Sequence, residues 1–313
     1  MRLVSRRTGL SPHVLRVWER RYGAVRPFRS AGGQRLYTDA DIERLRLLQQ
    51  ATLAGRNIGQ LVQLSNETLE KLVNEDRRAQ PAPGDHGVPE RARAAAEAEA
   101  EMLVAVARQA VPRLDAAGLE AVLRRAIFGL GVAAALDHVV VPLLKSIGDG
   151  WARREITPAH EHLASAVVRR VLDSILKDCA PEPSAPTFVV ATPTGQVHEL
   201  GALLAAASAA AEGWRVVYLG SDLPVQDIAQ AARETRARAV GLSIVYTESG
   251  TRPEEDVARL ADVLPAGCRI LVGGAAAESG LDDHSAARVE IVNDLPALRS
   301  RLAVLQRAAS ASS

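Results

Sequence analysis

Residues 187–214, TFVVATPTGQVHELGALLAAASAAAEGW, contain the pattern that decides the fold of this chain. An apolar run leads into a polar loop in which Gly195 and Gly201 flank His198, and a helix of small residues follows. Strand-like runs then alternate with helical runs to the end of the chain. This alternation predicts a doubly wound, Rossmann-like parallel sheet. Because such sheets bind ligands beyond the carboxyl ends of their strands, we expect His198 at a ligand-binding edge.

Composition shifts divide the 313 residues into several segments. A helical head at 1–73 is followed by a linker rich in proline, glycine and charge at 74–93. Apolar residues at helical spacing then predict a four-helix bundle at 94–180, and the sheet occupies 187–308. We expect its strands at 188–192, 214–220, 239–245, 269–274 and 289–294, and its helices at 200–212, 225–236, 254–264 and 295–308, with one short helix before the last strand.

Charge is spread unevenly along the chain. Residues 1–60 hold 12 arginines and 4 acids, or +8, so a formal net charge of +1 leaves −7 for the remainder. A basic head on an acidic body indicates a module that binds a polyanion, joined to domains that do not. Cys179 and Cys268 form no disulfide framework, which is typical of a reducing cytoplasm. We expect no signal peptide and no membrane span.

The head contains a helix-turn-helix pattern. A first helix ends near Gly9, and Ser11 as N-cap with Pro12 behind it starts the second helix. Trp18 on that helix is expected in the core. A turn at Gly32–Gly33 between extended runs predicts a β-hairpin wing, and Thr38 with Asp41 then caps another helix.

This order of elements resembles the MerR family, whose wing pattern stands here as Arg29-x-x-Gly32-Gly33-x-Arg35-x-Tyr37. The resemblance implies a winged helix-turn-helix that binds double-stranded DNA as a dimer or higher oligomer. It further implies DNA contacts from seven side chains of the head: Arg16, Arg20, Arg21, Tyr22, Arg29, Arg35 and Tyr37.

Small residues surround the ends of the predicted strands and leave room for a long ligand. They form the pattern Gln196-x-His198-x-x-Gly201, then Ser243-x-Val245, then Gly273-Gly274. The pattern resembles the cobalamin-binding Rossmann domain, in which the histidine replaces the cofactor's own base and ligates cobalt from below. The resemblance implies that His198 is the lower cobalt ligand and that the other residues line the cofactor site. Gln196 stands where that family has an acid, and the first turn lacks the G-x-G-x-x-G of dinucleotide binding.

The bundle carries Trp151, Glu161 and His162. This set resembles the MerR-type, cobalamin-dependent, light-responsive regulators of the CarH/LitR family, in which the bundle covers the upper face of adenosylcobalamin. Light-responsive members place a histidine directly after the tryptophan, whereas this chain has Ala152. In the alternative interpretation these residues are structural: Trp151 is a core residue at the end of the bundle, and His160 and His162 cap a helix. Some relatives also hold a bilin.

Together these features predict a multidomain α and α/β protein that regulates transcription and is not an enzyme. We expect a repressor whose assembly, as a dimer or tetramer, and whose DNA binding depend on the cobalamin state, under the control of light. Two alternatives stay open. One is a light sensor that binds both cobalamin and a bilin, and the other is a corrinoid carrier that serves a methyltransferase.

Overall fold

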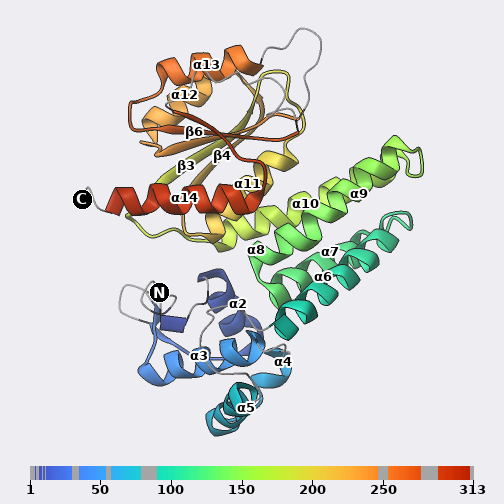
Figure 1. The fold of residues 1–313 in the computed structure, drawn as a ribbon, viewed down its shortest axis with the longest axis vertical. Coiled ribbons are helices and arrows are strands. Elements are labelled where there is room, and N and C mark those ends of the chain that lie inside the picture. The colour runs from blue at the N-terminus through green and yellow to red at the C-terminus, as the bar shows by residue number, and fades with distance from the viewer. Residues whose placement is uncertain are drawn as a thin grey trace. The chain divides into compact units, whose positions relative to one another are not determined.

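The computed structural model describes residues 4, 7–8, 10, 12–29, 35–53, 58–78, 90–245, 253–275 and 288–310 (Figure 1). The chain divides into two compact units, Met1–Ala164 and Ser165–Ser313, and helix α10 (Pro158–Asp178) runs across the division. Among these residues, no helix has both the length and the apolar composition that crossing a membrane requires.

The first unit begins with the predicted winged helix-turn-helix. Its elements are α2 (Pro12–Tyr22), β1 (Phe28–Arg29), β2 (Arg35–Leu36), α3 (Asp39–Leu53), α4 (Ile58–Leu61) and α5 (Asn66–Arg78). The strands pair antiparallel, with Phe28 opposite Leu36 and Arg29 opposite Arg35, and form the wing. The predicted turn and cap residues Gly9, Ser11, Gly32 and Gly33 lie outside the described residues.

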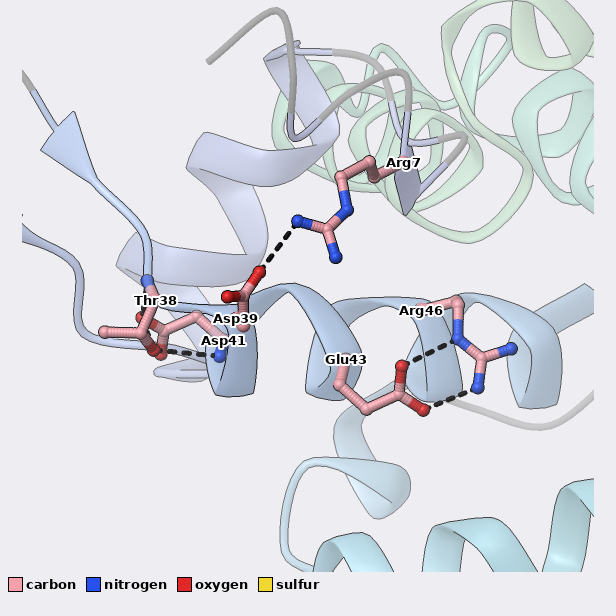
Figure 2. A network of polar contacts seen from close by, with 6 residues as sticks. All are labelled: Arg7, Thr38, Asp39, Asp41, Glu43 and Arg46. Carbon is pink, nitrogen blue, oxygen red and sulfur yellow. Dashed lines mark hydrogen bonds and ion pairs between the residues drawn. The ribbon is translucent and has the colours of Figure 1, made fainter.

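An apolar core holds the head together. Trp18 is only 3% exposed and packs with Leu15 of the same helix and Leu45 of α3. This confirms that Trp18 is a core residue. The predicted cap of α3 is also confirmed, because the Thr38 amide donates to Asp41 Oδ2 at 2.9 Å and the Asp41 amide donates back to Thr38 Oγ1 at 3.1 Å (Figure 2).

Arg44 of α3 is a structural arginine. Its guanidinium donates to the carbonyl oxygens of Ala24, Val62 and Leu64 at 2.8, 2.8 and 3.1 Å, and to Asn66 Oδ1 at 2.7 Å. One side chain therefore joins α3 to the segment before β1 and to the turn before α5. The net charge of +8 counted for residues 1–60 includes Arg44, although its hydrogen-bond donors are used within the fold.

We predict that Arg44→Ala destabilises the head by about 2 kcal/mol, because it leaves several carbonyl groups without their charged donor. The matched control is Arg46→Ala, on the same helix. Arg46 Nε donates to Glu43 at 2.9 Å in a partly exposed pair (Figure 2), and its loss should change stability by no more than about 0.5 kcal/mol. Urea unfolding of the two variants measures the difference, and equal losses would contradict the role assigned to Arg44.

The second half of the first unit is helical, as predicted. It contains α6 (Glu90–Ala110), α7 (Ala116–Leu130), α8 (Val132–Ala135), the π-helical turn η1 (Leu136–Val140) and α9 (Val141–Ala152), and α10 follows. Helix α6 packs against α7, η1 and α9. Helices α5 and α6 occupy both ends of the predicted linker 74–93, where glutamate, arginine and alanine residues favour helix. Residues 79–89, between these helices, lie outside the described residues.

The second unit contains the predicted doubly wound sheet. Its strands are β3 (Thr187–Pro193), β4 (Arg215–Leu223), β5 (Ala239–Ser243), β6 (Arg269–Gly273) and β7 (Val289–Ile291). All pairs are parallel, and the strand order is β4-β3-β5-β6-β7. Because the order reverses between β3 and β5, the topological switch point lies beyond the ends of these two strands.

Two helices cover each face of this sheet (Figure 1). They are α11 (Leu200–Ala211), α12 (Val225–Glu234), α13 (Pro253–Val263) and α14 (Leu295–Ser310). Phe188 and Val190 of β3 pack toward α11 and α14, whereas Val189 and Ala191 pack toward α12 and α13. Strand β3 is buried along its whole length, which explains the apolar run FVVA at its centre. The predicted short helix before β7 falls on residues 276–287, outside the described residues.

Candidate functional site

The loop after β3 is fastened to the end of β4. Its Gly195 adopts a positive φ of 83°, and the Gly195 amide donates to Asp222 Oδ1 at 2.8 Å. The Asp222 amide donates to Thr192 Oγ1 at 3.0 Å, and that hydroxyl donates to the Gln196 carbonyl. His198 follows this fastened turn and is exposed to solvent. The loop therefore presents an imidazole at the switch point of the sheet.

Gln196 joins the same loop to the end of β5. Its side chain is only 3% exposed, and its Oε1 accepts a hydrogen bond from the Val245 amide at 2.9 Å. Gln196 and Val245, two residues of the motif that are 49 positions apart in the sequence, are therefore in contact in the fold. An amide oxygen has a second lone pair and can accept another hydrogen bond.

The predicted glycines lie where neighbouring strands leave no room for a side chain. A Cβ atom on Gly201 would lie 2.5 Å from Ser243 Oγ. Only glycine at this position leaves room for the buried Ser243 hydroxyl. At Gly274, where φ is +106°, a Cβ atom would overlap the carbonyl oxygen of Ile244. A Cβ atom on Gly273 would lie 3.1 Å from the Val292 carbonyl. The structure thus brings the loop of His198 and the ends of β5 and β6 together at one edge.

This edge suits the cofactor that the motif implies. An exposed imidazole is a nitrogen ligand that cobalt accepts, and the Gly201–Ser243 contact forms a cradle that one added methyl group would fill. Within the described residues, no group of three or more histidine, cysteine, aspartate or glutamate side chains could hold a bare metal ion. If cobalamin binds at this edge, the protein would need to supply one nitrogen ligand to the cobalt, and His198 could supply it.

The predicted cap residues all belong to the first unit. Trp151, at the end of α9, is 56% exposed, so the structure excludes the alternative in which it is a core residue. The alternative role of His160 is confirmed, because its Nδ1 accepts the Thr157 amide at 3.0 Å at the start of α10. His162 has a different neighbour, since its Nε2 lies 3.7 Å from Glu161 Oε2. Contacts of Trp151, Glu161 and His162 with a cofactor stay predictions.

The predicted DNA-binding residues fall into two groups. Arg20 and Arg29 are exposed, and Arg16 and Tyr22 are half-buried, with Tyr22 packed against the head core. The side chain of Arg21 lies outside the described residues. Arg35 and Tyr37, in contrast, share one carboxylate. Arg35 Nε donates to both oxygens of Glu19 at 3.1 and 2.8 Å, and Tyr37 Oη donates to Glu19 Oε2 at 3.4 Å.

Glu19 is a functional candidate that the sequence analysis missed. It ties the second helix of the helix-turn-helix to the wing, and it sets the orientation of two predicted DNA contacts. Burial, and after it the charge of Glu19, raises the pKa of Tyr37 to about 12. One signal was available in the sequence, because Glu19 is the only acidic residue among the first 38.

We predict that Glu19→Gln lowers the pKa of Tyr37 from about 12 toward 10.0, since it removes a negative charge beside the phenol. Phenolate absorbance, with Tyr37→Phe as the subtracted reference, measures the change. Because the folded state holds this proton more tightly, the stability that it contributes is present below pH 10.0 and is lost as the pH rises toward 12. An unchanged titration would show that burial alone raises the pKa.

Comparisons with known families agree with the three parts of the chain. Residues 1–68 match the MerR HTH family regulatory protein model, and residues 103–176 and 186–290 match two B12 binding domain models. Among solved structures, the monomethylamine corrinoid protein of Methanosarcina barkeri aligns with a TM-score of 0.48 and 18% identity over 65% of this chain and 99% of that chain.

Two curated relatives match along most of the chain. The HTH-type transcriptional repressor CarH of Myxococcus xanthus is 35% identical over 271 residues, 87% of each chain. The repressor CarA of the same organism is 32% identical over 289 residues, 90% of this chain and 88% of that one. Both are transcriptional repressors, in agreement with the expected class of protein. The chain therefore belongs to the family of MerR-type transcriptional regulators with B12-binding domains that includes CarH and CarA.

Proposed function

We propose that this protein is a cytoplasmic repressor whose assembly and DNA binding are controlled by bound adenosylcobalamin and, through it, by light. One observation carries the proposal. A single chain joins a winged helix-turn-helix to an exposed imidazole that stands on a fastened loop at the switch point of a parallel sheet. The similarity to two repressors along most of the chain supports the same conclusion.

The sheet residues would hold the lower part of the cofactor. His198 would ligate the cobalt, with Gln196 and Val245 fixing its loop against β5. Gly201, Ser243, Gly273 and Gly274 would line the slot for the nucleotide tail, as the resemblance of their pattern to the cobalamin-binding domain implies, and the structure has them at the edge where the His198 loop meets the ends of β5 and β6. When bound, the cofactor supplies a cobalt–carbon bond that visible light can break.

The bundle residues would sense the upper ligand. Trp151 is exposed and can pack against an adenosyl group, while Glu161 and His162 lie near the start of α10. Ala152, whose side chain has no donor atom, follows Trp151. Residue 152 could therefore not ligate the cobalt if the adenosyl group were lost.

Assembly would set the affinity for DNA. Arg35 and Arg44 are engaged within the fold, so they add less to the positive charge that each head offers to DNA. A dimer or tetramer presents several heads to one operator, and linked heads bind far more tightly than one head alone. A cofactor that binds the assembled form more tightly than the separate chains must therefore also favour DNA binding.

Gel filtration and gel-shift assays of the full chain test the proposal in three states: without cofactor, with adenosylcobalamin in the dark, and after green light. We expect larger assemblies and tighter DNA binding in the dark, and loss of both after illumination. If assembly and DNA affinity are the same in all three states, the proposal is wrong. A response to adenosylcobalamin without a response to light would remove light as the signal.

Two further measurements separate the alternatives. Protein purified in the presence of both chromophores would show an absorption band in the red if a bilin also binds. Transfer of a methyl group from methylcobalamin to a thiol or amine acceptor would indicate a corrinoid carrier. We expect neither result for the repressor proposed here.

A further inference from the structure

Glu199 directly follows His198, and its side chain is used in an unexpected way. The residue occupies the N-cap position of α11, yet it makes no side-chain capping hydrogen bond to that helix. Its carboxylate instead accepts a hydrogen bond from Tyr218 Oη of β4 at 2.6 Å and forms an ion pair with Arg169 of α10. An N-cap side chain ordinarily accepts from the free amides of the first turn. The role of Glu199 is therefore not capping.

The partners of Glu199 belong to a well-packed part of the second unit. Leu176 of α10 packs against the apolar cluster between the sheet and the helices α11 and α14, and Tyr218 packs against the same cluster. Arg169, Asp173 and Leu176 are spaced along one face of α10, and the charges of Arg169 and Asp173 both act on Tyr218. The second half of α10 is thus a fixed platform on which the Glu199 carboxylate is held.

The contacts are of a kind that holds a loop in one position. The Glu199 side chain is 20% exposed and that of Arg169 is 41% exposed, so solvent screens the pair only in part. Hydrogen bonds to an ionised carboxylate are shorter and stronger than those between neutral groups. One peptide unit separates Glu199 from His198, and the opposite side of the loop is fixed by Asp222. Fastening on both sides fixes the backbone of the loop at His198.

We propose that Arg169 and Tyr218 are positioning residues that hold His198, through Glu199, in the orientation in which it ligates cobalt. The inference rests on the proposed function, because it assumes that His198 is the lower ligand.

The test uses the full chain reduced to the cob(II)alamin state and produced with histidine that carries the heavy nitrogen isotope. In the electron paramagnetic resonance spectrum, a labelled imidazole splits each cobalt line into a doublet, whereas the cofactor's own unlabelled base gives a triplet. The variants are Glu199→Gln, Arg169→Met and Tyr218→Phe. Arg169→Lys keeps the charge, and Arg170→Met, an exposed neighbour on α10, is the matched control.

We expect wild type and Arg170→Met to give doublets. Glu199→Gln and Arg169→Met should show a mixture with triplets and bind cobalamin about tenfold more weakly, the size of effect known for residues that orient a metal ligand. Tyr218→Phe should fall between these, and Arg169→Lys should restore the doublets. Thermal unfolding of the cofactor-free variants controls for misfolding.

Two outcomes can be told apart. If the wild type gives only triplets, or binds no cobalamin, the proposed function itself fails. If the wild type gives doublets and the Glu199 and Arg169 variants give the same doublets with unchanged affinity, His198 is the ligand but the positioning role of Glu199 is overturned.

Discussion

Replacing His198 by alanine should weaken cobalamin binding by at least about 100-fold and abolish ligation by the protein. The side chain is exposed on a loop that Asp222, Thr192 and Gln196 fix from within, and its removal leaves the hydrogen bonds of these three residues in place. The loss should exceed the 10- to 100-fold effects seen when residues that only orient a metal ligand are changed. Equilibrium dialysis gives the affinity, and the visible spectrum shows whether the cofactor's own base returns to the cobalt.

The matched control is His138→Ala, which removes another exposed imidazole, on η1. We expect this variant to bind cobalamin as the wild type does. Free imidazole added to His198→Ala should restore part of the wild-type spectrum, since the vacated position is open to solvent. Wild-type affinity and spectrum for His198→Ala would refute the assignment of the lower ligand.

Much of the fold could be predicted because its signals are local. The run TFVVATP has four consecutive apolar residues, FVVA, as is typical of a strand covered on both faces, and the structure confirms β3 there. The cap formed by Thr38 and Asp41 spans only three residues and was confirmed in the same way. A period or a cap can be recognised from neighbouring residues alone.

The missed residues depend on contacts between distant parts of the chain. Glu19 looks like an ordinary surface acid of a helix until the wing brings Arg35 beside it, 16 residues later. Asp222, which fixes the His198 loop, is 27 residues from Gly195. It also adopts a positive φ, which could not be predicted from its residue type alone. Glu199 was in the motif's own sequence, but only the folded chain places Tyr218 and Arg169 next to it. Spacing in sequence carries no information about such pairs.

Trp151 illustrates the opposite case, in which the structure decides between two predictions. A tryptophan at the end of an apolar helix fits a core position as well as a ligand-binding position. Its 56% exposure removes the first possibility within the described chain. An exposed tryptophan that follows the buried Gly150 presents a flat apolar surface, which is the feature that an adenosyl group would need.

Gly274→Ala should destabilise the sheet domain by about 3 kcal/mol or more. The Gly274 φ of +106° is strained for any residue with a side chain. A Cβ atom there would also overlap the Ile244 carbonyl oxygen, and it would lie 2.8 Å from the Ile244 carbonyl carbon and 2.9 Å from the Ile244 nitrogen. These are backbone atoms of the β5 end, where the Ile244 amide also donates to the Gly273 carbonyl at 2.8 Å. Because no flexible side chain can move aside, β5 and β6 must separate at this point.

Gly213→Ala is the control that isolates the steric part of this effect. Gly213 has a similar φ of +89° but no atom within 4 Å of its Cβ position, so its change should cost only about 1 kcal/mol of conformational strain. Urea unfolding gives the two stabilities, and hydrogen exchange of residues 239–245 locates the damage. The consequence should reach the cofactor, because Val245 follows Ile244 and donates to Gln196 in the loop of His198. Equal stability losses in the two variants, with unchanged hydrogen exchange in β5, would show that the close approach of Gly274 to Ile244 does not contribute to the stability of the sheet.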